Sequence, residues 1–136
     1  MSEFPRPVPQ AEIALDEQFW AHCNEERLCF QRCRDCDTWR HLPRHMCARC
    51  SSPDWEWAES SGRGRVFSWT VTHQAGHPAF ASDVPFAVVV VELEEGVRIV
   101  SLLRDHPLDA IELGLPVEVF FDRVSDDCVL PVFRPA

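Results

Sequence analysis

The feature that most constrains this chain is a pair of Cys-x-x-Cys motifs, Cys33 with Cys36 and Cys47 with Cys50. A turn of this spacing can direct both sulfurs toward one ion. Two such turns supply four sulfur ligands in the tetrahedral arrangement that Zn²⁺ prefers. Because four protein sulfurs leave no open coordination position, the predicted zinc is structural, and it would hold together a module with few aliphatic residues.

Three further residues compete as ligands. His41 or His45 could replace one sulfur in a Cys₃His site, whereas Cys29 could bind only by distorting the first turn. Iron in the same four-sulfur cage, as in an electron carrier, is the other alternative. The regular spacing of the two motifs favours zinc on four cysteines.

Length and composition predict a soluble globular protein of one domain, or of one domain carrying a small module, in 136 residues. No apolar run approaches the ~20 residues of a membrane span. The first ten residues, MSEFPRPVPQ, lack the layout of a signal peptide. A cytoplasmic location is therefore expected, with the seven cysteines present as thiols or metal ligands.

Charge narrows the range of functions. The chain has 13 Arg, no Lys and 22 acidic residues, giving a net charge of −9. Proteins that grip nucleic acid through many phosphates carry a larger basic excess, so no nucleic-acid partner is expected. A nucleic-acid-binding ribbon and barrel nevertheless stays the alternative function. The lack of Lys excludes Schiff-base catalysis, and Cys128, in an apolar strand after acidic residues, is a poor nucleophile.

The N-terminal part predicts an extended arm followed by a helix at residues 12–26. Phe19 and Trp20 are adjacent, and a small ribbon cannot bury both rings. Either the helix packs on the following domain, or part of this aromatic face docks a partner; the docking residues would be Phe19 and Trp20. The predicted boundaries are residues 1–28 for arm and helix, 29–61 for the ribbon and 62–136 for the second domain.

Beyond a glycine-containing hinge at Ser61–Gly64 the apolar period is two, which predicts strands and a mainly β protein. The first strand is expected to carry Phe67, Trp69 and Val71 on one face. Five strands are predicted, at residues 65–73, 85–93, 97–104, 116–124 and 128–133, with a short helical turn at 106–114. This layout is typical of a five-stranded OB-fold barrel whose helix closes the barrel bottom, although an SH3-like barrel or a small sandwich has a similar pattern.

Several motifs follow one another in order over about 120 residues. They are the FW helix, LCFQRCRDC, HLPRHMCARC, SGRGRVFSWTVTH, PFAVVVVELEEGVRIVSLL, LGLPVEVFF and LPVFRPA. In this combination the chain resembles the zinc-ribbon/OB-fold family of acyl-CoA-associated proteins. The resemblance implies an N-terminal helix, a rubredoxin-like zinc ribbon on the same four cysteines, and an OB-fold domain.

The resemblance also implies a function. Members accompany thiolase-family enzymes, including steroid side-chain aldolases, and in some cases hot-dog-fold enoyl-CoA hydratases. The companion stabilises the enzyme and helps to hold or channel a coenzyme A thioester, while the catalytic Cys and His belong to the partner. The expected function is thus a non-catalytic accessory subunit of a thiolase or steroid side-chain retro-aldolase, with acyl-CoA as ligand.

No sharp motif assigns the contacts to coenzyme A, so these are hypotheses from chemistry. They are Arg63, Arg65, Trp69, His73 and Phe80. Arginine suits phosphates, and aromatic rings suit adenine or an acyl surface. His73 also fits a hydrogen-bonded position at the end of a strand, without contact to a ligand.

Overall fold

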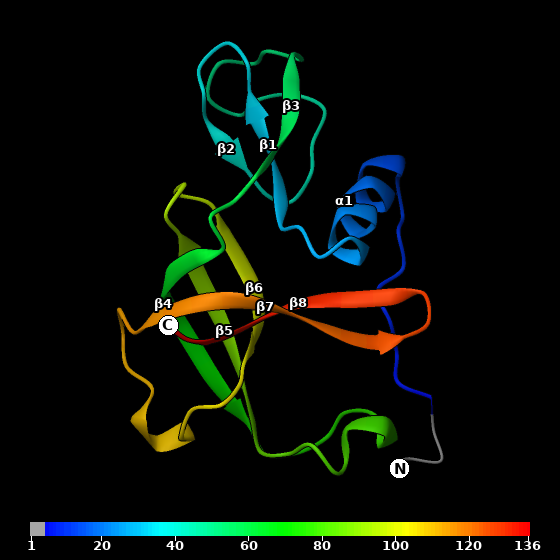
Figure 1. The fold of residues 1–136 in the computed structure, drawn as a ribbon, viewed down its shortest axis with the longest axis vertical. Helices are drawn as coiled ribbons and strands as arrows, with labels where there is room; N and C mark the ends of the chain where they lie inside the picture. Colours follow the sequence, from blue (N-terminus) through cyan, green and yellow to red (C-terminus); the bar gives the residue numbers. More distant parts are fainter. Residues whose placement is uncertain (1–4) are drawn as a thin grey trace.

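The computed structural model describes residues 5–136. One helix, a three-stranded antiparallel sheet and a closed five-stranded barrel make up the fold, so the mainly β prediction is confirmed (Figure 1). The helix is α1 (Ala14–Asn24), and the small sheet has the order β2-β1-β3, with β1 (Cys29–Cys33), β2 (Trp39–Arg40) and β3 (Trp55–Glu59). The barrel consists of β4 (Arg63–Thr72), β5 (Phe86–Leu93), β6 (Arg98–Leu103), β7 (Pro116–Ser125) and β8 (Cys128–Pro135).

The barrel has the strand order β4-β5-β6-β8-β7, and β4 pairs with β7 to close it. All neighbours are antiparallel except β6 and β8, which run parallel and meet at Leu103 and Phe133. Closure in this order is that of an OB-fold barrel, as predicted. Its interior is filled by inward-facing side chains such as Val89, Val91 and Val117, each at most 1% exposed.

The face predicted for the first barrel strand is wrong at Phe67. A β-bulge between Val66 and Ser68 shifts the register of β4 against β5. Val66, before the bulge, is buried, and Trp69 and Val71, after it, pair with buried residues of β5. Because the extra residue reverses the alternation, Phe67 lies outside the barrel, 46% exposed.

The helical turn predicted between the third and fourth strands is shorter than expected. It is a single 3₁₀ turn, η2 (Leu108–Ala110), because Pro107 begins it and the chain is already extended again at Ile111. Ile111 is buried and belongs to the core, and Leu108 of the turn packs against this core. A second 3₁₀ turn, η1 (Pro78–Phe80), interrupts the β4–β5 loop.

Helix α1 lies against both β1 of the small sheet and β8 of the barrel (Figure 1). Its inner face buries Leu15, Phe19 and Cys23. At its C-terminal end Asn24 donates to the Asp127 carbonyl (3.1 Å) and accepts from the Val129 amide (2.9 Å). The helix thereby joins the ribbon to the barrel. Among the described residues, no helix is long and apolar enough to cross a membrane.

His41 packs into this junction, with ring centroids 4.9 Å from Phe19 and 5.1 Å from Phe30. Desolvation lowers the pKa of His41 from 6.5 to about 4. The unfolded chain therefore binds a proton at a pH where the folded chain does not. The neutral ring stabilises the fold fully above pH 6.5, and this contribution is lost as the pH falls toward 4.

We expect the protonation of this residue to lower the free energy of unfolding by about 1.5 kcal/mol between pH 6.5 and pH 5. Denaturant unfolding of the zinc-loaded protein at pH 7, 6 and 5 measures it. His41→Phe is the matched variant, because it keeps an aromatic ring but cannot titrate, and the cysteines titrate equally in both proteins. Equal losses in the two proteins would contradict the assignment.

Candidate metal centre

The two cysteine turns repeat one backbone pattern. In the first, the Asp37 amide donates to the Cys33 carbonyl (3.0 Å), and the Cys33 amide donates to Thr38 (2.9 Å). In the second, the Ser51 amide donates to the Cys47 carbonyl (2.8 Å), and the Cys47 amide donates to the carbonyl one residue after Ser51 (2.9 Å). Asp37 and Ser51, each four residues after the leading cysteine, both have φ near +60°. This local chain reversal turns the sulfurs of each motif to the same side.

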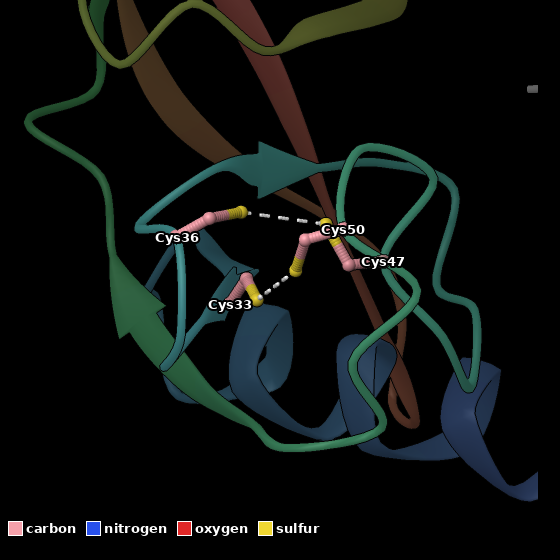
Figure 2. A group of neighbouring side chains, drawn as sticks. All are labelled: Cys33, Cys36, Cys47 and Cys50. Atoms are coloured by element: carbon pink, nitrogen blue, oxygen red, sulfur yellow. Dashed lines mark hydrogen bonds between the residues drawn. The ribbon is translucent and has the colours of Figure 1, made fainter.

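The four sulfurs converge from these two turns on one point (Figure 2). Cys33 Sγ lies 3.6 Å from Cys50 Sγ, and Cys36 Sγ lies 3.6 Å from Cys47 Sγ. All four lie within 4.8 Å of one another, and the cysteines are free thiols. Sulfurs at 2.3 Å from a tetrahedral Zn²⁺ are about 3.8 Å apart, so the cage has the size of a zinc site.

The pKa values of the clustered thiols indicate that a bound cation would stabilise their deprotonated forms. The contact with Thr38 Oγ1 (3.2 Å) lowers the pKa of Cys36 to about 6, and the Cys50 amide lowers that of Cys47. At Cys50 the Ser52 amide favours the thiolate, but desolvation and three neighbouring sulfurs outweigh it and raise the pKa to about 12. Four thiolates cannot share this space without a divalent ion, which Zn²⁺ supplies.

Hydrogen bonds join the first cysteine turn to the residues that follow the second. Ser52 Oγ donates to the Asp35 carboxylate and accepts from the Asp54 amide (3.1 Å). The Asp54 carbonyl in turn accepts from the Arg34 amide (3.0 Å). The first turn is thus tied to the chain that leaves the second, which fixes the spacing of the two sulfur pairs.

Gln31 is a structural residue that the sequence analysis did not single out. It is fully buried in β1, and its Oε1 accepts from the Arg44 amide (2.7 Å) and from Arg40 Nε (3.0 Å). Its Nε2 donates to the Arg44 carbonyl (2.8 Å). These three bonds fasten the chain before the second cysteine turn to the ribbon sheet. Only the polar character of Gln31 inside an apolar strand hinted at this role.

Replacing Gln31 with alanine should destabilise the zinc-loaded ribbon by about 1–3 kcal/mol, because buried polar groups on Arg40 and Arg44 lose their partner. Faster zinc transfer to a chelator and a lower thermal midpoint would register the loss. Gln18→Ala is the control, since Gln18 makes one exposed bond to Trp57 (2.7 Å). A change no larger than in the control would contradict the role.

Alternative ligands do not join the cluster. Among the described residues, the group of cysteine, histidine and acidic side chains close enough to hold a metal is the four predicted cysteines. His41 lies between Phe19 and Phe30, and Cys29 is buried in β1.

The residues predicted to contact coenzyme A do not form one cluster. Arg63 and Arg65 are exposed at the start of β4, and Arg65 donates to the Gly114 carbonyl (3.0 Å). Trp69 lies in mid-strand, His73 follows the strand, and Phe80 lies in η1. A ten-residue strand is about 30 Å long, so the arginines and Phe80 lie toward opposite ends of β4 (Figure 1). Their binding roles stay predictions.

The two predicted docking residues differ in burial. Phe19 is 4% exposed and contacts His41 and Phe30 inside the molecule. Trp20 is half-buried and packs edge-on against Phe19, with ring centroids 5.1 Å apart. The docking role of both residues stays a prediction. Of the two, only Trp20 has part of its side chain exposed where a partner could contact it.

Two cysteine turns on a three-stranded sheet, joined to this barrel, define a zinc-ribbon/OB-fold protein. Family comparisons agree with this class. Residues 20–56 match the ChsH2 rubredoxin-like zinc ribbon domain, and residues 57–122 match the ChsH2 C-terminal OB-fold domain. The chain belongs to the ChsH2 (DUF35) family.

Relatives within the family carry different names. The chain is 42% identical over 129 residues to a probable enoyl-CoA hydratase alpha subunit of Thermomonospora curvata, covering 94% of this chain but 40% of that protein. It is 32% identical to a DUF35 domain-containing scaffold protein of Methanocaldococcus jannaschii, covering 79% of this chain and 77% of that protein. Among solved structures, a chain of the Ltp2-ChsH2(DUF35) aldolase superposes with a TM-score of 0.85 at 38% identity, covering 93% of this chain and 98% of that chain.

Proposed function

We propose that this chain is an accessory subunit of an acyl-CoA enzyme of the thiolase family, either a thiolase or a side-chain aldolase, and that it performs no catalysis itself. The observation that carries the proposal is the likeness to a chain of the Ltp2-ChsH2(DUF35) aldolase, because it extends over nearly the whole of both chains. The scaffold-protein relatives, matched over more than three quarters of their length, support a non-catalytic role.

The chemistry of the chain's own residues is consistent with this role. The metal cage has four protein sulfurs, so a zinc ion held there would have no open position for a substrate or water. Outside the cage, desolvation raises the pKa of the thiols Cys23, Cys29 and Cys128, with Cys23 at about 12. Such thiols are protonated near neutral pH and make poor nucleophiles.

The proposal does not include the hydratase activity that the names of two relatives give. The chain spans 40% of the Thermomonospora subunit and 37% of a Mycobacterium tuberculosis 3-oxo-4,17-pregnadiene-20-carboxyl-CoA hydratase alpha subunit. Most of each of those proteins therefore lies outside the part that this chain matches. A hot-dog-fold hydratase is kept as a second partner class within the proposal.

Affinity capture from an extract of the native host tests the proposal. The tagged chain should retain a thiolase-family enzyme in stoichiometric amount, identified by mass spectrometry. Trp20→Ala should weaken retention, whereas Trp55→Ala, which changes a ribbon tryptophan on β3, serves as the control. Recovery of RNA or ribosomal proteins in place of an acyl-CoA enzyme would overturn the proposal.

A further inference from the structure

A groove of about 460 Å³ lies where helix α1, the ribbon loop after β2 and the barrel strands β6 and β8 meet. Its lining is mostly apolar, and none of the lining residues is acidic, although the chain carries a net charge of −9. Leu42 from the ribbon loop is 63% exposed, and Val100 from β6 is 68% exposed. With the half-buried Trp20 of α1, these side chains leave apolar surface open to another molecule.

One side of the groove is the edge of strand β6. This strand pairs with β5 along its length, but its pairing with β8 is limited to Leu103 and Phe133. In an antiparallel pair the hydrogen bonds fall on every second residue. Because the Leu93 amide donates to the Val97 carbonyl (2.9 Å), the odd-numbered residues of β6 are the ones bonded to β5. The backbone groups of the even-numbered residues therefore point away from β5, toward the groove.

The backbone of Val100 has no partner on this second side. Arg104, four residues later and of the same orientation, donates from its amide to the Phe133 carbonyl (2.8 Å). At Val100 the pairing with β8 does not continue, because Pro131 has no N–H and its carbonyl already accepts from Ser101 Oγ (2.7 Å). Within residues 5–136, the N–H and C=O of Val100 are thus left to solvent.

An unpaired strand edge beside an apolar groove fits an extended peptide segment. Such a segment adds a strand to the sheet: its main chain bonds to the edge, and its alternate side chains enter neighbouring pockets. Here the alternate side chains would pack against Trp20 and Leu42, which removes their exposed apolar surface from water.

The charge of the groove restricts the composition of the segment. Arg98 at the start of β6 is the charged residue of the lining, since burial keeps the pKa of His41 at about 4. The Arg98 guanidinium lies 3.8 Å from the centre of the Phe67 ring and is bonded to Glu92 (3.0 Å). With no acidic residue in the lining, an acidic residue of the segment is favoured beside Arg98, and a basic one is repelled.

We propose that this groove receives an extended segment of another protein, which adds a strand to the edge of β6 along residues 98–102. The segment carries apolar side chains at alternate positions and an acidic residue beside Arg98. That the acyl-CoA enzyme supplies the segment rests on the proposed function, whereas the strand addition itself does not. Trp20, predicted from the sequence to dock a partner, lines the same groove.

Two substitutions at Val100 separate the backbone from the side chain. Val100→Pro removes the N–H that faces the groove, and this N–H makes no bond to β5, so the pairing of β5 with β6 is kept. Val100→Thr keeps the N–H and a β-branched side chain of similar shape. Zinc content and the thermal midpoint of both variants should stay close to those of the wild type.

Nuclear magnetic resonance of the zinc-loaded, ¹⁵N-labelled full chain tests the proposal with the peptide acetyl-Glu-Val-Thr-Val-Thr-Glu-amide as the probe. We expect the peptide to shift the amide signals of Val100 and Leu102 as it binds. The same peptide with N-methylated valines and threonines keeps its side chains but cannot pair, so it should not bind. Val100→Pro should weaken binding about tenfold or more, because a main-chain hydrogen bond is lost and its acceptor is left unpaired. Val100→Thr should bind as the wild type does.

The outcomes separate strand addition from the proposed function. If the peptide does not bind, or if its N-methylated form binds equally well, strand addition is overturned even where an acyl-CoA enzyme is captured from the host. Equal binding by Val100→Pro and the wild type would overturn it as well. In the captured complex, hydrogen exchange of the β6 amides should be slower than in the free chain. Unchanged exchange, with peptide binding intact, would keep the groove and overturn the enzyme as the source of the segment. Peptide binding without capture of any acyl-CoA enzyme would overturn the proposed function alone.

Discussion

Cys47→Ser is expected to lose zinc and to unfold the ribbon. Cys47 is 3% exposed, and its sulfur lies 3.6 Å from that of Cys36 across the metal cage. Binding of a structural zinc ion is typically worth roughly 10–16 kcal/mol to a domain of this kind. The ribbon sheet has three short strands, and β2 spans two residues. Without the ion, little remains to oppose the conformational entropy of these segments. Most residues of the core cluster, such as Val89, Val91 and Val117, lie in the barrel strands, so we expect the barrel to stay folded.

The zinc content per protein, measured by mass spectrometry of the metal, should fall from one to near zero in this variant. Near-ultraviolet circular dichroism should report loss of the environment of Trp39, Trp55 and Trp57. Partner capture should be lost together with the zinc, because the ribbon positions α1. Cys128→Ser is the matched control, since Cys128 lies in β8 outside the cage, and it should keep its zinc. A Cys47→Ser protein that lost zinc but kept both the ribbon signal and the partner would contradict the structural role of the ion.

The second large effect is expected for Phe133→Ala in the barrel. Phe133 is fully buried and is paired with Leu103 where β8 meets β6. Its carbonyl also accepts from the Arg104 amide (2.8 Å) at the same junction. Removing the ring leaves a cavity in the core beside the junction of β6 and β8, which should cost about 3–5 kcal/mol. A typical domain has only about 5–15 kcal/mol of stability, so the variant should be close to unfolding at room temperature.

Urea unfolding of the zinc-loaded protein measures this loss. Phe120→Ala is the control, because Phe120 lies on the adjacent strand β7, is half-buried and has Arg134 5.2 Å from its ring centre. It should lose clearly less stability than Phe133→Ala. Equal losses in the two variants would contradict the expected importance of the buried Phe133 ring at the β6–β8 junction. Zinc content should stay unchanged in both variants, since neither residue lies in the ribbon.

Much of the fold could be predicted from local patterns. The alternation of apolar residues placed the five barrel strands, because each strand has one face in the core. The Cys-x-x-Cys spacing predicted the four cysteines whose sulfurs converge in the structure, because two cysteines three residues apart can bind one ion from a single turn. Both signals depend on neighbours along the chain. The bulge beside Phe67 could not be foreseen in this way, since it arises from how β4 pairs with β5.

The candidate contacts illustrate the same limit. Arg63 and Phe80 were predicted to contact one ligand because of their side-chain chemistry. Arg63 begins the ten-residue strand β4, whereas Phe80 lies in η1, beyond the other end of that strand. Phe19 is a large aromatic residue of the type that often docks partners, but it is buried in contact with His41 and Phe30. The sequence did not predict a contact for Arg6, which lies in a proline-rich arm. The path of that arm in the folded protein brings the Arg6 guanidinium over the Phe80 ring.

By itself, the sequence determined the four candidate metal ligands, the strand pattern and the membership of a zinc-ribbon/OB-fold class, because spacing and periodicity along the chain encode them. Only the tertiary structure decided which aromatic residues are buried, how Gln31 fastens the ribbon, and that Arg6 of the N-terminal arm lies over the Phe80 ring of η1. These features depend on contacts between segments far apart in the chain, and no local pattern of residues specifies such contacts.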